Sequence, residues 1–228
     1  MKGIVVHGAF AGPPVRHGFT TRAARDDWEA LARAAGFHEL RTLSQVHGRA
    51  VVRAEDVESG AAADAVITDR PGLLLGVQSA DCVPVLLWDE RRGAVGAVHA
   101  GWRGTAAGVT AAALRAMRDR YGTRAADVQA LIGPAIGPCC YEVGDEVREA
   151  LERVAPGAGA PAGRGANGGA TVDLWRANRL GLEAAGVEPE RILLVAQCTR
   201  CRADLYPSFR REGPGCGRIL SFIGIAGS

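Results

Sequence analysis

Two histidines and one cysteine offer the side chains best suited to hold a metal ion in this 228-residue sequence. His47, Cys82 and His99 each lie where a predicted strand meets a turn, in SQVHG, SADCVP and VHAGWRG. Such strand ends present functional side chains to a cleft. Two imidazoles and a thiolate suit zinc and leave a fourth position open, as in catalytic sites. Because ligands 35 and 17 positions apart form no local motif, spacing alone slightly favours three unrelated residues.

Cys82 also permits two other interpretations. It could be a nucleophile with His47 or His99 as its base and Asp81 beside it, as in a thiol hydrolase. It could instead be a buried structural residue, since free cysteines are among the most buried side chains. A serine hydrolase fits poorly because the sequence has no GxSxG nucleophile elbow.

The segment GWRGT at residues 101–105 suggests an anion site. It leads into a predicted helix, whose free N–H groups and dipole attract negative charge. Arg103 adds a guanidinium suited to phosphate. A glycine-rich turn with a surface arginine explains the segment equally well. An anion bound here would lie close to a metal held by His99.

Four more cysteines form two short groups, the adjacent pair Cys139–Cys140 and the CxxC pair Cys198 and Cys201. One CxxC is a weak zinc signal. If the turn is extended, the adjacent side chains point in opposite directions. A four-cysteine zinc site is conceivable, but adjacent cysteines rarely bind one zinc ion together, so structural or incidental roles are the preferred interpretation.

Composition indicates an ordinary globular protein, with 47% hydrophobic and 23% charged residues. A net charge of +2 is too small to indicate a basic surface that binds nucleic acid. No apolar run reaches the roughly 18 residues of a membrane span, and Gly and Pro interrupt the N-terminal segment too early for a signal peptide. We therefore expect a cytoplasmic protein whose cysteines stay reduced.

Hydrophobic patterning predicts both strands and helices. The run at 73–88 should form two buried strands joined by a tight bend, and residues 105–121 should form a helix capped by Thr105. Consecutive strands in the first half imply antiparallel pairs, so the predicted fold class is a mixed α/β (α+β) single domain over 1–228, with a flexible surface loop at 156–170. Further strands are predicted at 2–7, 50–53, 64–68, 93–99, 128–132, 192–196 and 218–225, and helices at 25–36, 144–154 and 173–185.

Five segments taken together resemble the laccase-domain family. They are LSQVHG, ADAVITDRPGLLLGVQSADCVPVLL, GAVHAGWRGT, GPAIGPCCYEVG and DLWRANR, and the similarity runs from Gly18 to the end of the chain. Bacterial members of that family are described as purine nucleoside phosphorylases or peptidoglycan editing factors, and formerly as multicopper polyphenol oxidoreductases.

The resemblance implies mixed sheets covered by helices and a zinc ion on His47, Cys82 and His99, which would also be the catalytic residues. It thereby overturns the preference for three unrelated residues. It implies phosphorolysis of adenosine, inosine, guanosine or methylthioadenosine, with adenosine deamination as a further activity. The implied partners are a purine nucleoside and phosphate, without nucleic acid, membrane or an obligate protein partner.

Arg22, Gln45 and Arg103 match positions that the resemblance implies line the substrate pocket. On this interpretation phosphate would lie near the predicted helix start at Thr105, held by Arg103 and Arg22, and Asp81 would orient a ligand histidine or act as a base. The sequence departs from the family pattern in two places. The segment 23–42 is shorter than usual, which could change a wall of the pocket, and CTRC replaces a segment with a single cysteine.

Three competing functions remain open at this point. A copper polyphenol oxidase is supported by the two histidines and one cysteine, but the chain has five histidines in all, too few for an additional trinuclear copper cluster. Its internal methionine, Met117, lies on a helix stripe and is a poor axial ligand. The other two are a cysteine hydrolase that edits peptidoglycan precursors and a zinc-stabilised binding module without activity.

Overall fold

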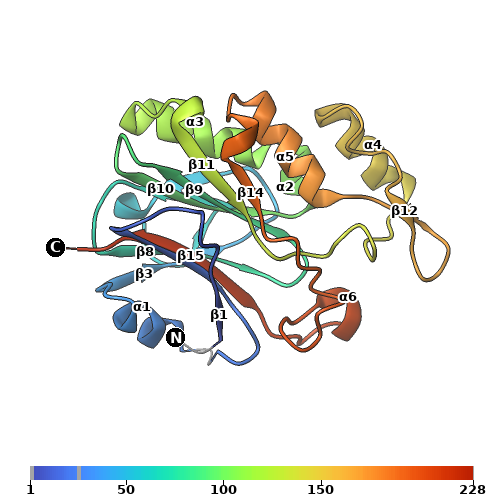
Figure 1. Cartoon of the computed structure of the whole chain (residues 1–228), viewed down its shortest axis with the longest axis horizontal. Helices are drawn as coiled ribbons and strands as arrows, with labels where there is room; N and C mark the ends of the chain where they lie inside the picture. Colours follow the sequence, from blue (N-terminus) through green and yellow to red (C-terminus); the bar gives the residue numbers. More distant parts are fainter. Residues whose placement is uncertain (1–2, 25–26, 228) are drawn as a thin grey trace.

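Two mixed β-sheets packed face to face form the centre of the computed structural model, which describes residues 3–24 and 27–227 (Figure 1). The larger sheet has the order β14-β11-β9-β10-β7-β5, with strands Ile192–Leu194, Val128–Ile132, Val83–Asp89, Ala94–Ala100, Ala65–Thr68 and Val51–Arg53. The smaller has the order β1-β2-β15-β8-β3, with strands Ile4–Val5, Val15–Thr20, Ile219–Ile225, Leu73–Ser79 and Glu39–Arg41.

Helices cover the outer face of each sheet (Figure 1). Above the six-stranded sheet lie α2 to α5, with bounds Trp102–Ala106, Val109–Tyr121, Asp145–Val154 and Leu174–Ala184. Helix α1 (Trp28–Ala34) packs against β3 under the other sheet. The predicted class, mixed sheets sandwiched by helices, is therefore confirmed. Shorter elements are α6 (Phe209–Glu212), three 3₁₀ turns (Ala54–Asp56, Ala125–Asp127 and Pro189–Arg191) and two small pairs, β4 (Leu43–Ser44) with β6 (Ala61–Ala62) and β12 (Gly163–Arg164) with β13 (Ala170–Thr171).

Strand β9 shows why the central strands are apolar on both faces. Val85 and Leu87 belong to the core beneath the helices. Leu86 and Trp88, which point the other way, belong to the core between the two sheets. Because a strand alternates its side chains, a strand covered on both faces has a continuous apolar sequence instead of an alternating one.

The predicted pair of strands within 73–88 is confirmed as β8 and β9, but the two strands enter different sheets. Strand β8 pairs with β15 and β3, whereas β9 pairs with β10 and β11. The intervening residues carry the chain from one sheet to the other, and Asp81 adopts a positive φ of 88° there. The bend at Asp81–Cys82 is thus the crossing between the two sheets.

The prediction of a single helix over 105–121 is wrong in the first turn of that range. The structure has two helices, α2 and α3, separated at Gly108, whose φ of 74° leaves the helical region. Glycine adopts this conformation readily because it has no Cβ. Thr105 lies inside α2, and Gly101 is the N-cap. The predicted end at residue 121 is confirmed, and Gly122 follows as the C-cap with a left-handed φ of 71°.

The other predicted elements are present with small shifts in their bounds. Helices α4 and α5 match the predicted ranges, and Asp173 caps α5 by accepting from the Arg176 N–H. The segment predicted as a flexible loop contains the small β12–β13 pair. The first predicted strand and the first predicted helix are shorter than expected, and their residues 2, 25 and 26 lie outside the described part.

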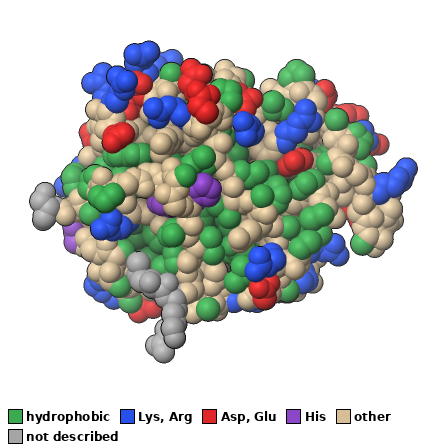
Figure 2. Space-filling view, viewed as in Figure 1, with side chains coloured by type: hydrophobic (Ala, Val, Ile, Leu, Met, Phe, Trp, Pro, Cys, Tyr) green, Lys and Arg blue, Asp and Glu red, His purple; other side chains and the backbone are tan. Residues whose placement is uncertain are grey.

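Acidic and basic side chains intermingle over the helical layer on the face shown in Figure 2, with hydrophobic side chains scattered below them. This face therefore carries no broad field of one sign. Among the described residues, no helix has both the length and the apolar character that crossing a membrane requires.

Candidate metal and substrate site

His47, Cys82 and His99 meet at one end of the stacked sheets. His47 lies in the turn after β4, Cys82 directly precedes β9, and His99 is the penultimate residue of β10. One ligand atom from each side chain lies within 4.8 Å of the others. The two imidazole rings are 5.0 Å apart and nearly perpendicular, at 79°. The structure thus brings together the three residues that sequence spacing alone left unconnected.

Asp64 holds both histidines in place. Its buried carboxylate lies just before β7, and Oδ1 is 2.9 Å from His99 Nδ1. The same carboxylate accepts the backbone N–H groups of His47 at 2.9 Å and Gly48 at 2.6 Å. These bonds fix a turn in which His47 has a positive φ of 59°. Such a conformation costs free energy in a residue with a side chain, and the surrounding bonds maintain it.

A glycine leaves room for the cluster. Gly101 lies beside the site, and a Cβ atom there would stand 3.0 Å from Cys82 Sγ and 3.1 Å from the His47 ring. These distances are tighter than ordinary carbon contacts. A larger residue in place of the first glycine of GWRGT would therefore have to push the Cys82 and His47 side chains aside by a few tenths of an ångström.

The pKa values of Cys82, His99 and Asp64 are shifted by their neighbours in the cluster. Desolvation would raise the pKa of Cys82, but hydrogen bonds from His47 and His99 outweigh it and lower the pKa to about 7. Desolvation would lower the pKa of His99, but its bonds to Asp64 and Cys82 raise it to about 9. The pKa of Asp64 is lowered because hydrogen bonds from His99, Gly48 and His47 overcome the opposing effect of desolvation. The cluster therefore favours a thiolate stabilised by imidazoles.

This donor set fits zinc. With Nδ1 bonded to Asp64, His99 presents Nε2 to the cluster. In zinc sites, a ligand histidine usually donates the N–H of its other ring nitrogen to an outer group such as a carboxylate, which fixes the orientation of the ring. Two nitrogens and a thiolate leave a fourth position free. The residues present therefore fit a catalytic zinc ion.

A cavity of about 500 Å³ opens beside the cluster. This volume lies within the range of small-molecule sites. Apolar, amide and positively charged groups all contribute to its wall. The lining residues are Leu43, Gln45, His47, Gln78, Ser79, Ala80, Asp81, Cys82, His99, Ile136, Tyr141, Phe209, Arg210 and Arg218.

Among the residues predicted to line a substrate pocket, Gln45 lies in this wall. Its amide is bonded to the backbone of Gln78 in both directions, at 2.6 Å and 2.7 Å. Arg22 and Arg103 lie outside the lining set. Arg22 bonds the Tyr206 carbonyl and pairs with Glu212.

Arg103 stacks over its neighbour Trp102, with the guanidinium carbon 4.3 Å from the ring centre. Thr105, near which the resemblance implied a phosphate, is buried inside α2, and its hydroxyl accepts from the Asn178 side chain at 3.1 Å. The cations in the cavity wall are instead Arg210 and Arg218.

Asp81 uses its carboxylate to hold C-terminal segments, whereas the carboxylate bonded to His99 is that of Asp64. The Asp81 carboxylate accepts from the Thr199 hydroxyl at 2.6 Å, the Ser208 hydroxyl at 3.1 Å and the Arg210 N–H at 2.6 Å. It therefore anchors two C-terminal segments at the cavity, and Asp64 is the carboxylate that orients a histidine.

Sequence reasoning missed Asp64, Tyr141, Phe209 and Arg218 as parts of the site. Asp64 was visible as a carboxylate immediately before a buried strand, inside the motif ADAVITD. Arg210 lies in the segment SFRR, which the sequence alone does not connect with the site. For Phe209 and Arg218 no local signal exists, because the tertiary fold alone brings these exposed side chains to the cavity.

The sequence and the fold were both compared with those of known proteins, and the matches extend over nearly the whole chain. The sequence model of the family described as "Multi-copper polyphenol oxidoreductase laccase" matches residues 18–226. The crystal structure of YlmD from Geobacillus stearothermophilus superposes with a TM-score of 0.89 at 31% identity, covering 99% of this chain and 97% of that one. A Neisseria meningitidis protein gives a TM-score of 0.87 at 30% identity, covering 99% of this chain and all of that one, 100%.

Relatives with similar sequences carry enzyme names. "Purine nucleoside phosphorylase" from Bacteroides thetaiotaomicron is 43% identical over 165 residues, 71% of this chain and 60% of that protein. "Adenosine deaminase RL5" from an unknown prokaryotic organism is 40% identical over 178 residues, 76% of this chain and 67% of that protein. With the family match extending over nearly its full length, this chain belongs to the laccase-domain family, the multi-copper polyphenol oxidoreductase laccase group.

Proposed function

We propose that the protein is a zinc-dependent purine nucleoside phosphorylase with adenosine deaminase side activity. Its substrates would be adenosine, inosine, guanosine or methylthioadenosine together with phosphate, and its products the base and ribose 1-phosphate or methylthioribose 1-phosphate. The observation that carries the proposal is the three-ligand cluster of His47, Cys82 and His99 at the wall of a cavity of about 500 Å³. Relatives named purine nucleoside phosphorylase and adenosine deaminase support the choice of substrate.

His47, Cys82 and His99 would hold the zinc ion, which when bound supplies a Lewis acid for an oxygen atom or for water. Arg210 and Arg218 line the same cavity and provide cations for a phosphate group. These two arginines would place phosphate on the side of the cavity formed by the C-terminal segments.

The remaining wall suits a nucleoside. Phe209 is 50% exposed although it lines the cavity, so its ring offers a face on which a purine base can stack. Desolvation and the charge of Cys82 raise the pKa of Tyr141 to about 12. Like any tyrosine whose pKa lies well above 7, Tyr141 keeps its proton at neutral pH, and it can donate a hydrogen bond to a ribose or phosphate oxygen.

The donor sets count against a multicopper oxidase. Within the part of the chain that the structure describes, the clusters of three or more potential ligands containing histidine or cysteine are His47–Cys82–His99 and a group of four cysteines. Neither offers the many imidazoles that a trinuclear copper cluster would need. The observed ligands suit a single catalytic ion better.

The proposal is tested by incubating the zinc-loaded protein with adenosine or inosine, with and without phosphate. Liquid chromatography would follow base and ribose 1-phosphate, and a coupled assay would follow ammonia. We expect base release from inosine to require phosphate, and ammonia to form from adenosine without phosphate. Absence of both base and ribose 1-phosphate from every nucleoside would contradict the phosphorylase proposal.

A further inference from the structure

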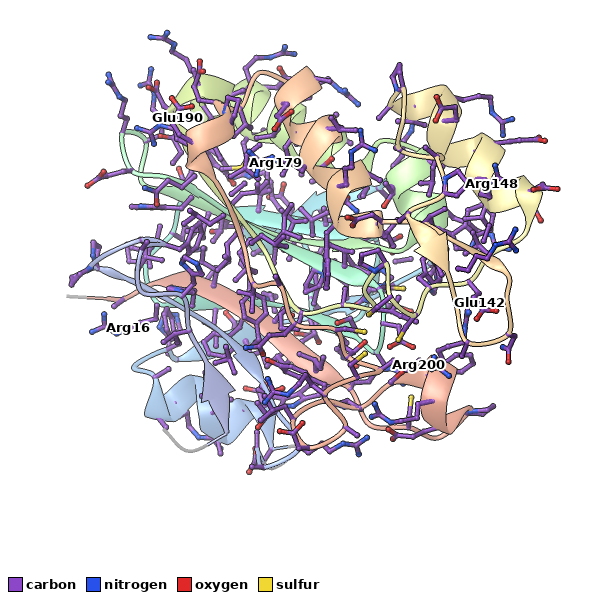
Figure 3. All side chains as sticks on the ribbon, turned by 45° about the vertical axis from the view of Figure 1, so that its right-hand side comes forward. Arg16, Glu142, Arg148, Arg179, Glu190 and Arg200 are labelled. Carbon is purple, nitrogen blue, oxygen red and sulfur yellow. The ribbon has the colours of Figure 1, made fainter. Side chains whose placement is uncertain are left out.

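Four cysteines outside the cavity wall come together in the fold. Cys139 and Cys140 follow β11, and Cys198 and Cys201 follow β14. Their sulfur atoms all lie within 4.8 Å of one another. Figure 3 shows sulfur atoms gathered on the side of the molecule where Arg200 is labelled. Two segments about sixty residues apart in sequence thus contribute two thiols each.

The backbone explains how adjacent cysteines face one partner. The turn is wound, since the N–H groups of Cys140 and Tyr141 both donate to the Gly137 carbonyl, at 2.9 Å and 3.0 Å. Cys139 Sγ and Cys140 Sγ consequently lie 3.6 Å and 3.4 Å from Cys201 Sγ. The objection that adjacent cysteines point in opposite directions applies only to an extended turn.

Cys198 completes the group from the interior. A β-bridge between Ala135 and Cys198 aligns the two segments. The Gly137 N–H donates to Cys198 Sγ at 3.2 Å, a bond that favours a thiolate. Cys198 and Cys140 are buried, whereas Cys139 and Cys201 are exposed. The cluster is therefore anchored in the core and open to solvent on one side.

The separations match a tetrahedral metal–thiolate site. Zinc–sulfur bonds of about 2.3 Å in a tetrahedron place sulfur atoms about 3.8 Å apart. A disulfide would require two sulfurs at about 2.0 Å, whereas Cys139 Sγ and Cys140 Sγ lie 3.6 Å and 3.4 Å from Cys201 Sγ. Four thiols at metal-site spacing are better satisfied by one soft divalent cation.

We propose that Cys139, Cys140, Cys198 and Cys201 bind a second zinc ion in a structural site. Four protein ligands close the coordination sphere, as in structural zinc sites, so this ion would take no part in the chemistry. The site goes beyond the proposed nucleoside activity and does not depend on it.

The second ion would stabilise the wall of the cavity. Tyr141, which lines the cavity, directly follows Cys140. Thr199, between the other two ligands, donates to Asp81 at 2.6 Å, and Asp81 precedes the catalytic ligand Cys82. Binding would therefore hold together two segments that position the cavity wall, at a distance from the reacting groups.

Zinc content of anaerobically purified full-length protein, measured by mass spectrometry, tests the proposal. We expect two zinc ions per chain in the wild type and one in Cys201→Ser, which changes an exposed ligand. Cys216→Ser, a matched cysteine outside both clusters, should retain two. His47→Ala should retain one, in the four-cysteine site.

X-ray absorption on zinc-loaded His47→Ala decides the ligand set even if Cys201→Ser fails to fold. We expect about four sulfur neighbours at about 2.3 Å. Wild-type zinc content in folded Cys201→Ser, a nitrogen-containing ligand set in His47→Ala, or a disulfide among the four cysteines would overturn the proposal. None of these measurements uses nucleoside turnover, so the result is independent of the proposed enzyme activity.

Discussion

Asp64 Oδ1 lies 2.9 Å from His99 Nδ1 and also accepts the backbone N–H of His47 at 2.9 Å. One buried carboxylate therefore sets the ring orientation of His99 and holds the turn that carries His47. Because Asp64 is fully buried, its negative charge acts on His99 with little screening by water.

Substitution Asp64→Asn should weaken zinc binding. The side chain keeps its size, but it loses the charge and one of its two acceptor oxygens. Loss of such an outer support typically lowers metal affinity by roughly 10- to 100-fold. Competition with a chromophoric chelator measures the change. Asp69→Asn, at the other end of the same strand and exposed, is the control, and equal affinities for the two variants would contradict the assigned role of Asp64.

Substitution Cys82→Ala should remove zinc from the catalytic site and nucleoside turnover together, because the thiolate is one of only three proposed protein ligands. Cys216→Ser, which changes a cysteine outside both metal clusters, should retain its zinc. Zinc content and phosphate-dependent base release are measured on the same preparations. A Cys82→Ala protein that keeps its catalytic zinc but loses all activity would instead favour Cys82 as a nucleophile, as in the cysteine hydrolase interpretation.

Alkylation of Cys82 in metal-free protein should depend on pH with a midpoint near 7. The pKa of this thiol is lowered to about 7 from the ordinary 9.0. The thiolate, which is the reactive form, therefore predominates above pH 7 and is lost below it. His47→Ala removes one hydrogen-bond donor and should move the midpoint upward. Peptide mass spectrometry after iodoacetamide labelling gives the rates, and a midpoint near that of an ordinary thiol would refute the lowered pKa.

Substitution Arg218→Gln should raise the KM for phosphate and leave adenosine deamination unchanged, because deamination uses no phosphate. A hydrogen bond to a charged group contributes about 1.5–3 kcal/mol, which corresponds to a roughly ten-fold or larger increase in KM. Steady-state kinetics with each substrate varied in turn separates the two effects. Arg16→Gln, an exposed arginine labelled in Figure 3, is the control. An unchanged KM for phosphate would place the anion elsewhere.

Periodicity predicted most elements of the fold because burial determines both the pattern and the structure. The apolar run at 73–88 predicted two buried strands, and both are present. The sequence could not predict that β8 and β9 enter different sheets, because several of the strands that they pair with lie far away in the sequence. The break at Gly108 was missed because the apolar stripe continues through it, although glycine permits the left-handed φ that ends α2.

The site could be predicted only in part, because its residues also come together from distant parts of the sequence. His47, Cys82 and His99 stood out by residue type and by their places at strand ends. Their convergence depends on the crossing between sheets at Asp81, which no local pattern encodes. Arg218 reaches the cavity from the segment before the last strand, more than a hundred residues from any ligand histidine, so only the tertiary structure indicates it.

The most direct test of the central claim is reconstitution of inosine cleavage. Metal-free protein would be assayed with phosphate alone, then with added zinc, and in parallel with added copper, while hypoxanthine and ribose 1-phosphate are measured. We predict no cleavage without metal and restoration by zinc but not by copper, with one catalytic ion per chain. Full activity in the metal-free protein, or restoration by copper with phenol oxidation, would contradict a zinc-dependent nucleoside phosphorylase.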